Sequence, residues 1–139
     1  MNEAQARRRV LEELRSAMSK WTAEPIPFDG CAIGQCDIHR AVFGVDPAAE
    51  WRGRYTTVRG MRRIMGKGGL PGCLARAARR LKWRRIKPAD AKPGDVGIVI
   101  APPGVAIVRL MRPGEWVGRN ARGFSVLPTE AVRAAWSIL

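Results

Sequence analysis

The chain has 139 residues, of which 46% are hydrophobic and 27% charged, a balance that is typical of a folded globular domain and excludes a disordered chain. One domain over residues 1–139 is the expected organisation, because the chain is too short for two well-buried cores. The formal net charge of +13, from 25 basic and 12 acidic residues, favours partners that carry negative charge.

Membrane and export signals are not expected. The longest apolar run, residues 96–108, is interrupted by Gly97, Pro102, Pro103 and Gly104 and falls short of the roughly 20 residues that a membrane-spanning helix needs. The N-terminus reads as a charged helix where a signal peptide needs an apolar stretch, so we expect the chain to be made in a cytoplasm. Three cysteines, an odd number, favour free thiols over a disulfide framework.

Helices are expected to fill the first half of the chain. Over residues 3–21 the apolar positions recur at spacings of four, four and three, which predicts an amphipathic helix with Val10, Leu14, Met18 and Trp21 on its inward face. Prolines and a glycine end it within residues 22–30. A second helix is expected over residues 31–43, with Asp29 as its N-cap and an inward stripe formed by Ala32, Cys36, His39 and Phe43.

Two more helices are expected before the chain changes character. Residues 55–65 predict a third helix, since their apolar side chains share one face. A fourth helix is expected to begin with Pro71 in its first turn and to extend through Leu81.

The C-terminal part predicts a small antiparallel sheet. Short β-branched or apolar runs, separated by Pro-Gly turns, cover residues 96–101, 105–111, 115–117 and 123–127. Thr129 is placed to cap a last short helix over residues 130–136. The expected fold class is therefore α+β, with N-terminal helices packed on a C-terminal antiparallel sheet. Within the single domain we distinguish an N-terminal helix (1–24), a helical part (25–92), and a β-meander with a terminal helix (93–139).

A basic segment accounts for the whole excess of positive charge. Residues 51–89 contain thirteen basic side chains and no acidic one. Sequence-independent DNA binding is one interpretation, in which the basic side chains contact phosphates and Trp83 stacks on a base. The residues of this candidate site are Arg76, Arg79, Arg80, Lys82, Trp83, Arg84 and Arg85. A solvated helix face that keeps the protein dissolved is the other.

The stretch DGCAIGQCDIH, residues 29–39, concentrates the reactive side chains. Cys31 opens a predicted helix, where backbone N–H groups favour a thiolate and hence a nucleophile. His39, the only histidine, is eight residues further on, about 12 Å along a continuous helix and about 80° around it, and cannot serve Cys31 as a base from there. It is three residues from Cys36, but that thiol lies on the inward stripe, where thiols are usually inert.

A metal site is a weak alternative for the same residues. Cys31, Cys36, His39 and the distant Cys73 supply ligand types, but their spacing lacks the usual C-x2-C pair. We therefore expect neither a metal nor another cofactor.

Several motifs, in order, resemble an uncharacterised family encoded in tail-gene clusters of bacteriophages and prophages, which is distantly similar to the NlpC-type, papain-fold cell-wall peptidases. Cys31 is followed thirteen residues later by Gly-Val-Asp-Pro at residues 44–47. The remaining motifs are AAEWRGRY, KPADAKPGDVGIV and AVRAAWSI, at residues 48–55, 87–99 and 131–138. The similarity spans residues 25–139.

The resemblance implies a papain-like fold in which Cys31 takes the nucleophile position at the start of a helix on a small sheet. It implies also that a strand begins at Asp95-Val96 and that the catalytic histidine opens the next strand. Gly104 stands in that histidine's place, and the residues leading to Cys31 depart from the peptidase pattern. Without a base a cysteine peptidase loses most of its activity.

The sequence thus predicts a structural component of a phage or phage-like tail tip or baseplate, an inactive cell-wall-peptidase-like domain that binds tail hub or fibre proteins. Peptidoglycan and DNA are further expected contacts of the basic segment. The first alternative is an active peptidoglycan endopeptidase or amidase that uses Cys31 with an unrecognised base, and His39 is the other candidate catalytic residue. The second is a DNA-binding protein that uses residues 51–89. In the first interpretation the protein is made in the bacterial cytoplasm and assembled into a virion or virion-like tail.

Overall fold

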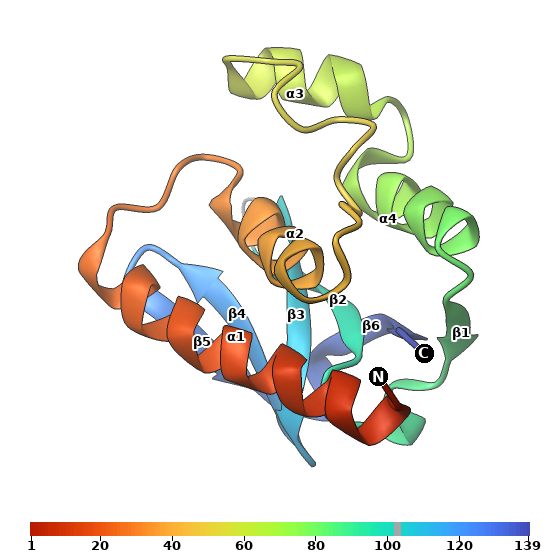
Figure 1. Cartoon of the computed structure of the whole chain (residues 1–139). Helices are drawn as coiled ribbons and strands as arrows, with labels where there is room; N and C mark the ends of the chain where they lie inside the picture. Colours follow the sequence, from red (N-terminus) through yellow and green to blue (C-terminus); the bar gives the residue numbers. More distant parts are fainter. Residues whose placement is uncertain (102–103) are drawn as a thin grey trace.

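The computed structural model describes residues 1–101 and 104–139 (Figure 1). The proposed Pro-Gly turn at Pro102 and Pro103 lies outside the described residues. Four helices come first: α1 (Glu3–Ala23), α2 (Gly30–Phe43), α3 (Val58–Met65) and α4 (Gly69–Arg80). Six strands follow: β1 (Arg84–Ile86), β2 (Val96–Ala101), β3 (Gly104–Arg112), β4 (Glu115–Asn120), β5 (Gly123–Leu127) and β6 (Val132–Ser137).

The strands form one antiparallel sheet in the order β1-β6-β2-β3-β4-β5. The expected α+β class, helices first and an antiparallel sheet afterwards, is confirmed. Helices α1 and α2 pack on this sheet, while α3 and α4 lie to one side of it (Figure 1). None of the helices in the described part of the chain has the length and apolar character needed to cross a lipid bilayer.

Helix α1 begins with a full capping box and lies across α2 and β5. The Asn2 side chain accepts from the Gln5 backbone N–H, and the Gln5 side chain accepts from the Asn2 backbone N–H. Its buried residues, Ala6, Val10, Leu14 and Trp21, follow the predicted stripe. Gly34 of α2 faces the Trp21 ring closely enough that a Cβ there would lie 3.0 Å from it. The small residue therefore sets how closely the two helices approach.

Helix α2 is fixed to the sheet by a buried arginine. Arg109 on β3 is 1% exposed and donates to the Gln35 backbone carbonyl from Nη2 (3.0 Å), to Gln35 Oε1 from Nε (3.2 Å) and to the Gly94 carbonyl from Nη1 (2.8 Å). The Gln35 amide in turn donates to the Val117 carbonyl on β4 (2.9 Å). None of these bonds goes to a carboxylate, and burial lowers the pKa of Arg109 to about 10.

A second buried polar group joins α1 to the sheet and the C-terminus. Asp95 is 1% exposed and accepts from Arg7 Nη1 (2.8 Å), from the Lys92 backbone N–H (2.8 Å) and from the Ile138 backbone N–H (3.1 Å). Three segments far apart in the sequence therefore meet at one carboxylate.

The third helix is shorter than predicted, whereas the fourth agrees with the prediction to within two residues at each end. Helix α3 starts only at Val58, because the Thr57 side chain accepts from the Gly60 backbone N–H and caps it there. Helix α4 begins at Gly69 and ends at Arg80, and residues 84–86, for which no strand was predicted, form the edge strand β1.

The predicted terminal helix over residues 130–136 is wrong. A single 3-10 turn occupies Thr129–Ala131, and β6 follows between β1 and β2. The reason is tertiary pairing: β6 supplies the backbone partners for both neighbours, and its Val132, Ala135 and Trp136 side chains are buried.

Replacing Asp95 by alanine is expected to lower the free energy of unfolding by about 3–5 kcal/mol, because it leaves Arg7 and two buried N–H groups without their acceptor. Urea denaturation of Asp95→Ala measures the loss. Glu50→Gln is the matched control, since the Arg76–Glu50 pair is exposed and 3.5 Å long, and should cost less than about 1 kcal/mol. Equal effects of the two changes would contradict the role given to Asp95.

Candidate functional site

Cys31 lies in the first turn of α2, against the end of the sheet. Its Sγ donates to the Val105 carbonyl on β3 at 3.7 Å, and the side chain is half-buried. The preceding residue must be small, because a Cβ on Gly30 would lie 2.7 Å from Ile26 Cγ1 and 3.0 Å from Pro27 Cδ. The loop before α2 thus presses on the helix start and holds Cys31 in place.

The surroundings of Cys31 favour the neutral thiol. Burial raises the pKa of the Cys31 thiol, and the carboxylate of Asp29 raises it further. A backbone hydrogen bond lowers the pKa of Cys31; its effect is smaller than that of burial and larger than that of the Asp29 carboxylate. Cys31 therefore has the position of a helix-terminal nucleophile without the low pKa that makes such a thiol reactive.

No side chain stands at the position where the resemblance places a base. Gly104 opens β3 opposite Ala101, and a Cβ built on Gly104 meets no atom of the described residues within 4 Å, its chain neighbours aside. Gly104 shares a sheet face with Ala106, two residues further on, which belongs to the apolar cluster against which Cys31 packs. A side chain at position 104 would thus have open space on the face that Cys31 contacts.

His39 lies in the core, on the inward stripe of α2. It is 4% exposed, and its ring centroid is 4.4 Å from that of Phe43 and 5.0 Å from that of Trp83. Burial, with a smaller contribution from Arg109, lowers the pKa of His39 to about 3. His39 is two turns away from Cys31 on a continuous helix, so the structure does not bring the two together.

The other two thiols are also buried. Burial raises the pKa of Cys36 to about 12, and the Cys73 thiol donates to the Met65 carbonyl at 3.7 Å. Among the residues that the structure describes, no three histidine, cysteine, aspartate or glutamate side chains come together as a metal site.

A cluster beside Cys31 was not found from the sequence. The Tyr55 hydroxyl donates to Asp29 Oδ2 at 2.8 Å, and the Phe28 ring lies 5.8 Å from the Tyr55 ring. Asp29 is the predicted N-cap residue of α2, but its side chain makes no capping hydrogen bond and accepts from Tyr55 instead. Burial and this bond raise the pKa of Tyr55. The only signal in the sequence was the position of Tyr55 at the end of the AAEWRGRY motif.

The residues predicted for DNA binding are divided by the structure into engaged and free ones. Engaged side chains are Arg76 with Glu50, Arg80 with the carbonyls of residues 46 and 47, Arg84 with the carbonyl of Leu139, and Arg85 over the Trp136 ring. Trp83 is 8% exposed and packs against His39, so its ring is not available for stacking on a base. Arg79 and Lys82 are the members of this set that remain exposed and without an ionic partner in the described part of the chain.

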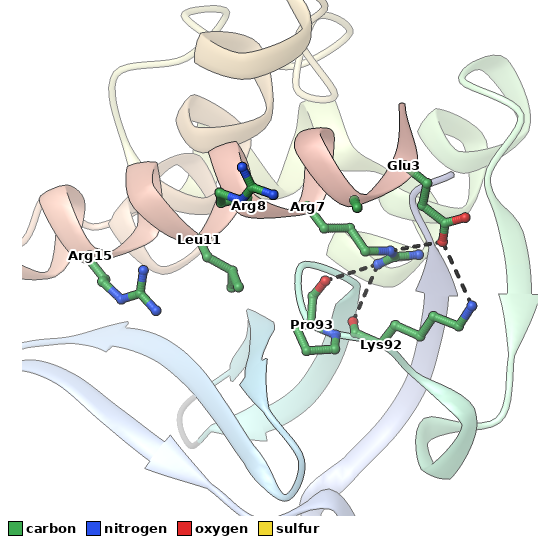
Figure 2. A pocket seen from close by; sticks show the side chains of 8 residues that line it. Glu3, Arg7, Arg8, Leu11, Arg15, Lys92 and Pro93 are labelled. Atoms are coloured by element: carbon green, nitrogen blue, oxygen red, sulfur yellow. Dashed lines mark hydrogen bonds and ion pairs between the residues drawn. The ribbon is translucent and has the colours of Figure 1, made fainter. Parts of the chain in front are cut away.

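A shallow hollow of about 620 Å³ runs along α1, and Cys31 is not among the residues that line it (Figure 2). Arg7 crosses it and donates to Glu3 at 3.1 Å and to the Pro93 carbonyl at 3.0 Å. Lys92 also lines the hollow and forms a 3.8 Å ion pair with Glu3. Glu3, Arg7 and Lys92 satisfy one another's charges where α1 meets the loop before β2, while Arg8 and Arg15 also line the hollow.

Cys31 is expected to react slowly with iodoacetamide at pH 7, because its pKa lies above that of an ordinary thiol. A Cys36→Ala/Cys73→Ala variant leaves only this thiol to be measured, with free cysteine as reference. Asp29→Asn in that background should raise the rate, since it removes the neighbouring negative charge. Rapid alkylation of Cys31 at neutral pH would contradict the neutral-thiol assignment and favour an enzyme.

His39 makes the stability depend on pH. In the unfolded chain the ring binds a proton near its ordinary pKa of 6.5, whereas the folded ring stays neutral down to about 3. The stability is fully present above pH 6.5 and falls as the pH drops through this window, by up to about 1.4 kcal/mol per pH unit. Urea titrations at pH 7 and pH 5 should show a loss about 2 kcal/mol larger in the wild type than in His39→Phe. Parallel losses would mean that the folded ring is protonated.

Comparison with known proteins identifies a similar fold and a family for this chain. The structure is similar to a crystal structure of the NlpC/p60 domain of peptidoglycan hydrolase SagA, with a TM-score of 0.54 over 91% of this chain and 97% of that chain. The sequence identity is 16%, so the likeness establishes a shared NlpC/p60-like fold. No curated protein matches the sequence. A family model described as "Domain of unknown function (DUF6950)" matches residues 4–138, and the chain therefore belongs to this family.

Proposed function

We propose that the chain is an NlpC/p60-like domain that works by binding and does not hydrolyse peptides. The observation that carries the proposal is Gly104: the position on the sheet face beside Cys31 holds open space and no side chain. A cysteine hydrolase needs a base within hydrogen-bond reach of its thiol. Gly104 cannot supply one, and His39 is enclosed in the core.

The proposed setting is the tip or baseplate of a phage or phage-like tail, with tail hub or fibre proteins as partners. What supports this part is the order and spacing of the four motifs in the chain. In this setting the protein is made in the bacterial cytoplasm and is assembled into the particle.

Peptidoglycan is the proposed further contact of the domain. The domain of similar fold is described as part of a peptidoglycan hydrolase. In this chain Phe28, which is 47% exposed, Tyr55 and Asp29 lie together next to Cys31. Aromatic faces and a carboxylate are suited to hold the apolar and amine groups of a short wall peptide without cleaving it.

The rival function is an active endopeptidase or amidase with Cys31 as nucleophile. Incubation of the purified wild type with peptidoglycan fragments is expected to release no products, and Gly104→His is expected to gain measurable cleavage because it fills the open position. Gly104→His/Cys31→Ser is the matched control and should be inactive. Cleavage by the wild type that Cys31→Ser abolishes would overturn the non-hydrolytic proposal.

Binding and location are tested separately. The wild type is expected to sediment with purified cell-wall sacculi, and Phe28→Ala/Tyr55→Phe should bind at least several-fold less. Mass spectrometry and immunogold labelling of purified tail particles should place the protein at the tip. Absence of the protein from the particles would exclude the tail setting, and failure to sediment would exclude the peptidoglycan contact.

A further inference from the structure

The thirteen basic side chains of residues 51–89 fall into two groups. Five are engaged within the fold: Arg52 in ion pairs with Asp37 and Asp46, and Arg76, Arg80, Arg84 and Arg85 in the contacts given above. The other eight have no carboxylate within ion-pair distance in the described part of the chain: Arg54, Arg59, Arg62, Arg63, Lys67, Arg79, Lys82 and Lys87. All eight are exposed, so their charges face solvent or a partner.

Helix α3 gathers three of the free charges on one face. At 100° per residue, Arg59, Arg62 and Arg63 fall within a sector of about 100°. The opposite side carries Met61, which packs against the core, and Met65, which is buried. The outward sector of α3 therefore carries the three arginines, with Val58 and Ile64, each 41% exposed, to either side of it. This helix stands furthest from α1 in Figure 1. Insertion into a lipid surface needs a broad apolar face, and the exposed apolar side chains of α3 are only Val58 and Ile64. Three arginines in one sector are better suited to a phosphate polymer.

A second observation concerns Lys82, at the end of α4. Its φ is +61°, in the left-handed region that favours glycine. The turn is fixed by hydrogen bonds from Lys82 N to the Arg79 carbonyl (3.3 Å) and from Trp83 N to the Ala78 carbonyl (2.8 Å). A lysine at this position costs conformational energy that glycine would save, and it adds an exposed cation next to Arg79.

The burial of the Trp83 ring favours duplex over single-stranded nucleic acid as the ligand of this surface. Trp83 is the only aromatic residue of segment 56–89, and its ring is buried and packs against His39 of α2. Proteins that bind single strands rely on exposed aromatic faces for base stacking. This surface offers guanidinium and ammonium groups alone, and arginine forks match phosphate oxygens in pairs. It is thus suited to a backbone and not to bases.

We propose that these residues, Arg59, Arg62, Arg63, Lys67, Arg79 and Lys82, form a basic arm that binds the phosphate backbone of duplex DNA without sequence preference. The inference goes beyond the proposed function and uses neither Cys31 nor Gly104. It also moves the binding surface from the α4 residues indicated by the sequence to α3 and the end of α4.

The test compares two variants that remove the same charge. Arg59→Gln/Arg62→Gln/Arg63→Gln changes the arm, and Arg8→Gln/Arg9→Gln/Arg15→Gln removes three exposed arginines from α1. Fluorescence anisotropy with a labelled 30-base-pair duplex measures affinity from 25 to 200 mM salt. The arm variant is expected to bind at least tenfold more weakly, with a salt slope reduced by about 2 to 3. The α1 variant is expected to change less than threefold.

Lys82→Gly gives a test that loss of folding cannot imitate, because glycine suits the backbone there. It is expected to bind severalfold more weakly while unfolding at the same or a higher urea concentration. Equal weakening by the arm and α1 variants would show a simple net-charge effect and overturn the proposal. Tighter binding to a single strand of the same length, to poly(glycerol phosphate) or to phosphatidylglycerol vesicles would overturn the assignment to duplex DNA.

Discussion

The structure depends on the hydrogen bonds of one buried arginine. Arg109 sits at the centre of the sheet and joins the middle of α2 to β3 and to the turn before β2. A fully buried guanidinium is stable only when its donors are satisfied, so Gln35 and the Gly94 carbonyl must stay where they are. Helix α2 can neither rotate nor slide on the sheet without breaking these bonds. The arginine therefore fixes the register between helix and sheet, which an apolar contact alone would leave looser.

The position of Cys31 follows from this constraint. Because α2 is fixed at Gln35, one turn further along, its first turn is held against the end of β3 and the thiol reaches the Val105 carbonyl. The framework of a papain-like site is thus complete at the level of the backbone. What differs is the set of side chains that it presents: a neutral thiol, a glycine where the base would stand, and a tyrosine–aspartate pair nearby. In the proposed function, this set of side chains serves binding and not hydrolysis.

The local signals in the sequence predicted the helices α1 and α2 and the strand β5 with nearly correct ends. These elements have strong periodicity, and α1 also has a complete cap. The errors came from residues whose state depends on distant partners. Residues 84–86 and 132–137 are strands because they pair with each other, and no local pattern distinguishes them from helix ends. Arg109 and Asp95 likewise gave no signal, since a charged residue in a strand is ordinarily expected to face solvent. The placement of Cys31 at a helix start was accessible because a loop with two prolines precedes it.

The attachment of α3 has a consequence for how the molecule moves. Its main packing contacts are with α4, and glycines at positions 66, 68 and 69 join the two helices. Its attachment to the main core runs through Met65, which is buried, and Met61, which packs against it. We expect α3 to open at a lower free energy than the sheet with α1 and α2, because few buried apolar contacts have to break. Repulsion among Arg59, Arg62 and Arg63 opposes the folded helix, so the polyanion binding proposed above is expected to stabilise α3 and to couple binding to local order in this short segment.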